Sequence, residues 1–133
     1  MVLVDTTVWV DLLRDRVTAP VSVLKRLLQA GEAATAPVIL QELLQGASNP
    51  ENFKRLRKHF VALPLLEPRT QVATHVAAAA LYARCRWHGL TPRSPHECLI
   101  AQLAIEHGVP LLHDDRDFES LARVEPKLKF IAP

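Results

Sequence analysis

The sequence is poor in cysteine. It has only Cys85 and Cys98 among 133 residues, and the two form neither a CxxC motif nor a Cys/His spacing typical of metal sites. We therefore expect buried free thiols, not a disulfide, and no metal site built on sulfur. The chain is 49% hydrophobic and 23% charged, which is ordinary for a globular protein with a sizeable core, so we expect one domain over residues 1–133.

Long apolar runs are also absent, and no basic leader precedes a hydrophobic stretch. The N-terminus passes directly into a strand-like pattern, so we expect neither an export signal nor a transmembrane helix. The expected location is the cytoplasm, with no membrane partner.

Positive and negative charges nearly balance over the whole chain, but one stretch is basic. The formal net charge of +2 is too small to mark a nucleic-acid binder by itself. Residues 68–96, however, contain four Arg and no Asp or Glu. Within that stretch Arg84, Arg86 and Arg93 would suit RNA phosphates. Helix solubility and the favourable charge at a helix C-terminus explain the same arginines equally well.

Hydrophobic periodicity predicts buried strands that alternate with helices. Short β-branched and aliphatic runs at 2–5 and 109–113 are typical of fully buried strands. Weaker strand patterns occur at 32–38, 62–66 and 128–132. Helical patterns cover 20–31, 37–46, 50–60, 71–89 and 94–108. Such an alternation predicts an α/β sandwich with a parallel sheet, in which ligands gather beyond the carboxyl ends of the strands.

The first strand ends at an acid. Asp5 precedes Thr6 and Thr7, which begin a helical pattern, so its carboxylate is expected at the C-terminal edge of the sheet. Asp is a good N-cap, and a purely structural role remains open for Asp5. Trp9 follows four residues later and is expected in the core or in a dimer contact.

Two glutamates are further candidates. Glu42 lies on the flank of an apolar helical stripe, where a solvated side chain is the commoner outcome. Glu97 lies in "SPHE", where Ser94 and Glu97 match a capping box with Pro95 between them. A ligand role and a capping role therefore compete for the Glu97 side chain.

Three aspartates follow the strand at 109–113. Asp114 is expected to cap the next helix, which leaves Asp115 and Asp117 unexplained. An EF-hand loop is excluded, because a loop beginning at Asp115 would place Ser120 where glycine is required. His113 lies beside these acids and is usually a structural residue in such a place, although strand ends line ligand sites in α/β folds.

In combination these pieces resemble a known family. An N-terminal "VDTTVW", a helical "LQELLQG", the segment "RSPHECLIAQLAIEHGVPLLHDDRDF" and a length near 130 are similar to the PIN-domain ribonucleases, specifically the VapC-type toxins of type II toxin–antitoxin pairs. Each piece alone is a weak signal, whereas their order and spacing are specific. The resemblance covers nearly the whole chain. It implies a three-layer αβα sandwich with a short central parallel sheet.

The resemblance also implies a site, in which distant acids converge on a divalent ion, Mg²⁺ or Mn²⁺. The catalytic acids carried onto this chain are Asp5, Glu42, Glu97 and Asp115. The implied metal ligands are Asp5, Glu97, Asp115 and Asp117, and Thr6 or Thr7 would supply a hydroxyl beside the first acid for substrate binding. The implied partners are an RNA substrate, a VapB-type antitoxin and a second copy of the chain in a homodimer.

Electrostatics supports a metal independently of the family. Two carboxylates about 4 Å apart repel by roughly 4 kcal/mol at an effective dielectric constant of 20, so converging acids need a cation or shared protons. Oxygen ligands favour Mg²⁺ or Mn²⁺, which activate water for phosphodiester hydrolysis. The chain departs from the family at Glu97, where Asp is usual, and the extra methylene moves the carboxylate by about 1.5 Å.

Two other functions stay open. Phosphotransferases that use an aspartyl phosphate also begin with a strand-end Asp, but one common class repeats an Asp two residues later, where this chain has Thr7. The second is a catalytically weakened PIN-like module that binds RNA or a partner, with Glu97 serving only its capping box.

Overall fold

A short parallel sheet forms the centre of the molecule. The structure, a computed structural model, describes residues 1–132. Its strands are β1 (Val2–Val4), β2 (Ala33–Ala34) and β3 (Leu111–Leu112), in the order β2-β1-β3 with all pairs parallel. All three strands are fully buried. Because parallel neighbours end at the same edge, the residues after β1 and β3 lie close together.

Each edge of the sheet gains one further bridge instead of a strand. Thr35 bridges to Leu65 and Leu111 bridges to Phe130, both in parallel. The strands expected at 62–66 and 128–132 therefore pair with the sheet, but only at one position each. At the first edge the reason is Pro64, which accepts a hydrogen bond from the Thr35 N–H and has no N–H of its own to continue the ladder.

Helices make up most of the remaining chain. They are α1 (Thr6–Leu13), α2 (Ala19–Ala30), α3 (Pro37–Gln45), α4 (Pro50–Phe60), α5 (Gln71–Trp87), α6 (Pro95–Glu106) and α7 (Arg116–Val124). The expected starts are confirmed: α2, α4 and α6 have side-chain caps followed by a proline in the first turn. Across residues 1–132, every helix falls short of the length and apolar character that a membrane crossing requires.

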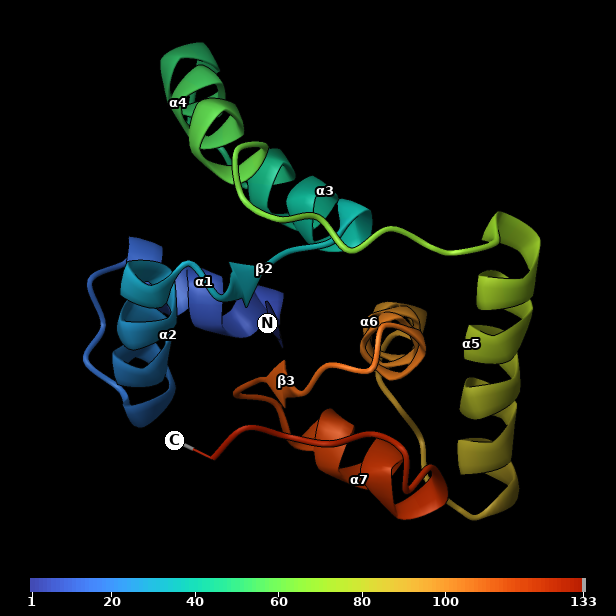
Figure 1. Ribbon diagram of the computed structural model, residues 1–133. Coiled ribbons are helices and arrows are strands. Elements are labelled where there is room, and N and C mark those ends of the chain that lie inside the picture. Colours follow the sequence, from blue (N-terminus) through green and yellow to red (C-terminus); the bar gives the residue numbers. More distant parts are fainter. Residues whose placement is uncertain (133) are drawn as a thin grey trace.

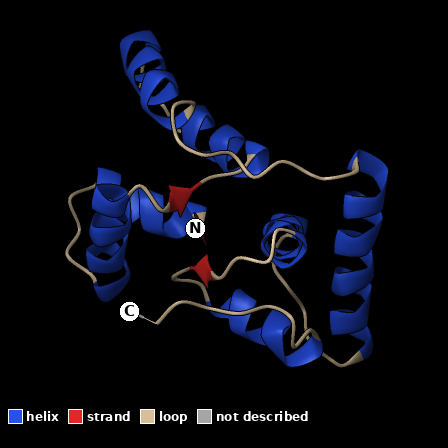
Figure 2. Ribbon diagram, in the orientation of Figure 1, coloured by secondary structure: helices blue, strands red, loops and turns tan. Residues whose placement is uncertain are grey.

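The helices enclose the sheet in layers. In Figure 1 the strands lie in the middle of the molecule, with α1 and α2 on one side and α5 and α6 on the other. Figure 2 shows how small the strand content is relative to these helices. The arrangement is the three-layer αβα sandwich that the sequence predicts. It places the ends of β1 and β3 beside the N-terminus of α6.

The core confirms the expected role of Trp9 and the cysteines. Trp9 is buried, donates from Nε1 to the Val4 carbonyl at 3.0 Å, and packs edge-on against Phe60 with 5.1 Å between ring centroids. Cys85 and Cys98 are buried free thiols, and burial raises the pKa of Cys98 to about 12. A thiol held so far toward its neutral form is a poor metal ligand, consistent with the absence of sulfur-site spacing in the sequence.

Candidate metal centre

Asp5 lies at the end of β1 and begins the site. Its carboxylate caps α1, because Oδ2 accepts from the Thr7 N–H at 3.1 Å and from the Thr7 hydroxyl at 2.6 Å. The residue is only 4% exposed, and this burial raises the pKa of its carboxyl group to about 6. Capping and a functional role are therefore not alternatives for Asp5: the cap holds a buried carboxylate in a fixed orientation.

A cavity of about 450 Å³ opens in front of Asp5. Four separate parts of the chain supply its walls: the start of α1 with the turn that follows it, α3, α6 and the segment after β3. The lining residues are Asp5, Thr6, Thr7, Val10, Asp11, Arg16, Glu42, Glu97, Ile100 and Asp114. The structure thus brings together three of the four expected catalytic acids, Asp5, Glu42 and Glu97.

Glu42 is oriented toward this cavity from α3. The Thr6 hydroxyl donates to Glu42 Oε1 at 2.8 Å, and His96 Nδ1 lies 3.6 Å from the other oxygen, Oε2. The Glu42 side chain is partly exposed, at 25%. Thr6 and Thr7 therefore act in the same way on different acids, since each donates its hydroxyl to one carboxylate of the site.

Glu97 carries a buried oxygen without a hydrogen-bond partner. Its Oε2 atom is shielded from solvent and no group among residues 1–132 bonds to it. The capping box is only half formed: Ser94 caps α6, but its hydroxyl accepts from the His96 N–H at 3.1 Å, not from Glu97. Burial raises the pKa of Glu97, and the negative charges of Asp115, Asp5 and Asp117 raise it further.

An unpartnered buried carboxylate oxygen is costly and calls for an explanation. Divalent cations bind through oxygen ligands of this kind, so the residues present fit a hard metal ion. Glu97, Asp115 and Asp117 each offer a ligand atom, and these atoms lie within 4.8 Å of one another. Glu97 also lines the cavity in front of Asp5, so it belongs to both groups of acids.

The segment after β3 corrects one expectation. Asp115, not Asp114, caps α7, and its Oδ1 accepts from the Asp117 N–H at 3.0 Å. The reason is that the Asp114 N–H donates to the Thr7 hydroxyl at 3.2 Å, which ties this residue to the end of β1 before α7 begins. Asp114 also lines the cavity in front of Asp5, a position that the family resemblance did not assign to it.

Arg93 faces the aspartates of this segment. It donates from Nη2 to Asp115 Oδ1 at 2.7 Å and from Nε to Asp117 Oδ2 at 3.0 Å. Its side chain remains 73% exposed. Of the three arginines that the sequence offers for substrate, Arg93 is the one that the structure places at the acidic site.

Comparison with known proteins identifies the family. The family model described as "PIN domain" matches residues 2–124. The chain belongs to the PIN-domain family. It is 36% identical over 126 residues to "VapC ribonuclease Mb1587" of Mycobacterium bovis and to "Ribonuclease VapC11" of Mycobacterium tuberculosis, and the match covers 93% of this chain and of each relative.

Solved structures confirm the fold of this PIN domain. The structure of VapBC2 from Rickettsia felis matches with a TM-score of 0.74 and 18% identity, over 98% of both chains. FitAcB from Neisseria gonorrhoeae matches with a TM-score of 0.70 and 16% identity, over 99% of this chain and 97% of that chain. Identities this low bear on the architecture alone.

The other two arginines predicted to bind substrate, Arg84 and Arg86, lie elsewhere in this PIN domain. Arg84 is paired with Glu125 at the C-terminal end of α7, with 3.3 Å between Nη2 and Oε1. Asp115 caps the opposite end of that nine-residue helix, ten residues from Glu125 and thus about 15 Å away at 1.5 Å per residue. Arg86 is exposed on the last turn of α5. Their contact with substrate stays a prediction.

His113 holds the backbone of Asp115 in place. Its Nδ1 accepts from the Asp115 N–H at 3.1 Å, and its ring packs against Phe130 and Phe118 at centroid distances of 4.5 and 5.1 Å. Burial lowers the pKa of His113, which keeps the ring neutral and Nδ1 free to accept. The contacts of His113 are those of a structural residue that fixes the backbone of Asp115.

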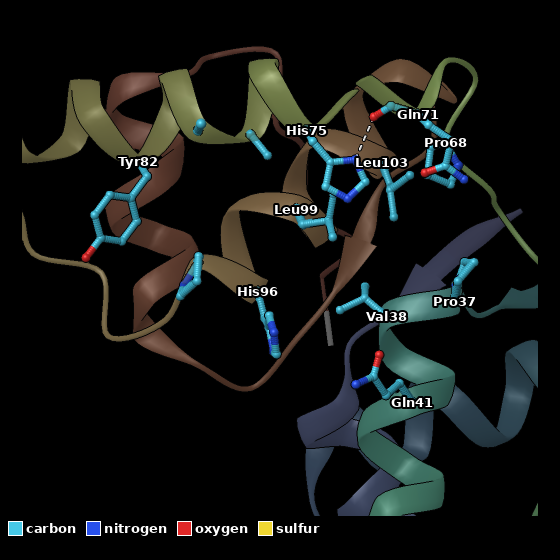
Figure 3. Close-up of a pocket in the computed structure, with 13 residues that line it drawn as sticks. Pro37, Val38, Gln41, Pro68, Gln71, His75, Tyr82, His96, Leu99 and Leu103 are labelled. Carbon is cyan, nitrogen blue, oxygen red and sulfur yellow. Dashed lines mark hydrogen bonds between the residues drawn. The ribbon is translucent and has the colours of Figure 1, made fainter. Parts of the chain in front are cut away.

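A larger cavity of about 760 Å³ lies beside the acidic one, between α3, α5 and α6. Figure 3 shows apolar side chains such as Val38, Leu99 and Leu103 around it. His96 lines this cavity and also approaches Glu42, so it forms the partition between the two. The larger cavity has no carboxylate among its lining residues, and the acid chemistry belongs to the smaller one.

The raised pKa of Asp5 leads to a testable pH dependence. In metal-free protein the folded state binds this proton more tightly than the unfolded chain, so the stabilising effect is complete below about pH 4 and is lost as the pH rises to about 6. The loss amounts to about 3 kcal/mol. The wild type should therefore have a lower free energy of unfolding than Asp5→Asn at about pH 7.5. We expect this difference to be smaller by about 1 kcal/mol at about pH 5.

Urea unfolding in EDTA at the two pH values measures this difference. Comparing the two proteins cancels the titration of groups that do not interact with Asp5, among them His113. A difference that is independent of pH would show that Asp5 is not the titrating group.

Proposed function

We propose that this PIN domain is a divalent-metal-dependent endoribonuclease that hydrolyses RNA phosphodiesters and acts as the toxin of a toxin–antitoxin pair. The observation that carries the proposal is the convergence of Asp5, Glu42 and Glu97 on one cavity from separate elements. Two further acids, Asp115 and Asp117, offer ligand atoms within 4.8 Å of one from Glu97. The curated relatives at 36% identity are named VapC ribonucleases, which supports the same activity.

The acids of the proposed metal centre are those predicted from the sequence, Asp5, Glu97, Asp115 and Asp117. All of them offer carboxylate oxygens, a donor set that favours Mg²⁺ or Mn²⁺ over zinc. The chemistry supplied by a bound divalent cation is the acidification of water and the neutralisation of charge on the phosphodiester. A cation would also relieve the crowding of negative charge that raises the pKa of Glu97.

The side chains of the centre have separate tasks in this proposal. Thr7 holds the Asp5 carboxylate, and Thr6 holds one oxygen of Glu42. The second Glu42 oxygen, Oε2, stays available to accept a proton from water in the cavity, and His96 Nδ1 lies 3.6 Å from it. Arg93 lines the neighbouring cavity with Glu97 and Asp115, where it would contact a phosphate of the substrate, as predicted from the sequence.

The proposed partners follow from the relatives. Solved structures that share the fold include VapBC from Salmonella typhimurium bound to DNA, at 19% identity, and a toxin–antitoxin complex from Klebsiella pneumoniae. We infer that this chain likewise has a cognate antitoxin of the VapB type and acts in the cytoplasm. Homodimer formation stays a prediction.

Metal removal tests the proposal directly. We expect purified protein to cut RNA internally with Mg²⁺ or Mn²⁺ and to lose at least about 100-fold in rate when EDTA is added, with recovery on excess Mn²⁺. The activity is followed on a folded RNA of known sequence, across gel-filtration fractions so that cleavage can be matched to the protein peak. RNA binding without cleavage in every fraction would favour a binding module and would contradict the proposal.

A further inference from the structure

The acids of the centre form two halves that share Glu97. The first half, around the cavity in front of Asp5, includes Glu42 and Glu97. The second half consists of Asp115 and Asp117, whose ligand atoms lie within 4.8 Å of one from Glu97. A neighbouring cavity of about 630 Å³, lined by Arg93, Glu97 and Asp115 among others, lies over the second half.

The two halves differ in how their charge is balanced. In the second half, Arg93 donates from Nη2 to Asp115 and from Nε to Asp117, and its backbone N–H donates to the same Asp117 oxygen at 3.2 Å. Both aspartates therefore already face a positive charge. These hydrogen bonds raise the pKa of Arg93, which carries its charge at all ordinary pH values.

Among residues 1–132, no arginine or lysine is paired with the acids of the first half. Arg16 also lines its cavity, but the guanidinium is paired with Asp11 at 3.1 Å. His96 Nδ1 lies 3.6 Å from Glu42 Oε2, too far for a hydrogen bond. The buried oxygen of Glu97 has no hydrogen-bond partner within residues 1–132. The unbalanced negative charge of the centre is thus concentrated between Asp5 and Glu97.

We propose that the Arg93 guanidinium is the built-in cation of the Asp115–Asp117 half, so that the centre takes up one divalent ion, on the Asp5–Glu97 side, and excludes a second. The inference rests on the proposed metal-dependent function. Ions of a two-metal site lie about 3.5–4 Å apart and share carboxylates, as these halves share Glu97. A guanidinium that bridges two carboxylates occupies that second position, and it repels any further cation there.

The position of Arg93 in the chain suits this role. It lies in the connection between α5 and α6, two residues before α6 begins with Pro95. The bond from its backbone N–H to Asp117 fixes the connection whatever the side chain, so a substitution at this exposed site removes the charge without removing that contact. Arg93 is therefore a positioning residue that sets the number of ions.

The test is the Mn²⁺ stoichiometry, read from the electron paramagnetic resonance signal of free Mn²⁺ during titration of the full chain. We expect one Mn²⁺ per chain for the wild type and two for Arg93→Gln. Arg93→Lys keeps the charge and should stay at one. Arg116→Gln is the matched control and should also stay at one. Arg116 lines the same cavity but forms no ion pair within residues 1–132.

The possible results separate the two proposals. If wild type and Arg93→Gln both bind one ion, and the wild type cleaves RNA, the proposed role of Arg93 is overturned while the metal-dependent function stands. Two ions in the wild type overturn the role of Arg93 as well. No bound Mn²⁺ and no cleavage in the wild type would overturn the metal-dependent function and this inference together. Arg93→Ala, with thermal melting as a folding check, shows whether any gain depends on the glutamine itself.

Discussion

Asp5→Asn should lose divalent-dependent RNA cleavage by about 100-fold or more while the chain remains folded. Asp5 is 4% exposed and lies at the edge where the acids meet, so removing its charge removes a central ligand. The amide oxygen of asparagine can still accept from the Thr7 N–H, and asparagine is an equally good N-cap. The variant therefore separates chemistry from folding.

The measurement is single-turnover cleavage of RNA at saturating Mg²⁺, together with urea unfolding in EDTA. Asp15→Asn is the matched control, because Asp15 is an exposed aspartate whose backbone has a φ of 56°, a conformation that asparagine also tolerates. Asp15→Asn should cleave RNA at the wild-type rate. Full activity in Asp5→Asn would instead move the site away from the end of β1.

For RNA cleavage, the charge of the Glu97 side chain should matter much more than its length. Glu97→Gln keeps the shape but removes the charge that faces the metal, and we expect a loss of about 100-fold in cleavage rate. Glu97→Asp keeps the charge, moves the carboxylate back by about 1.5 Å, and introduces the residue that the family resemblance leads us to expect there. We expect it to retain activity within about 10-fold of the wild type.

Growth of cells and RNA fragments after induced expression measure the same pair in vivo. Wild type and Glu97→Asp should arrest growth, and Glu97→Gln should not. If Glu97→Gln arrested growth as strongly as wild type, the glutamate would be a capping residue with no part in the chemistry. We do not expect that outcome, because the capping box is only half formed. The Ser94 hydroxyl accepts from the His96 N–H and not from the Glu97 N–H.

Much of this arrangement could be predicted because it depends on local patterns. The apolar run at 2–4 followed by Asp5 marks both a buried strand and its end, and the same holds for Leu111 and Leu112 before the aspartates. Two parallel strands that end at one edge bring their following residues together without any further information. The family resemblance then added Glu42 and Glu97, which periodicity alone left as solvated or capping residues.

What the sequence could not show depends on contacts between distant segments. The capping-box spacing at Ser94 and Glu97 is satisfied by the serine alone, and only the packed structure shows that the glutamate oxygen is buried. The prediction that Asp114 caps α7 was wrong, and Asp115 is the cap. The Thr7 hydroxyl, more than a hundred residues earlier, accepts from the Asp114 N–H and holds that residue outside the helix. Arg93 was predicted to face substrate, and its pairing with two site acids has no local signal.

The Thr7 hydroxyl has a consequence for the rigidity of the whole centre. It donates to Asp5 and accepts from the Asp114 backbone, so one oxygen atom links the ends of β1 and β3. An ion that arrives there meets ligands whose spacing is already set, and it loses little conformational freedom of the chain on binding. Removing the Thr7 hydroxyl would make the positions of the acids less fixed without replacing any of the acids themselves.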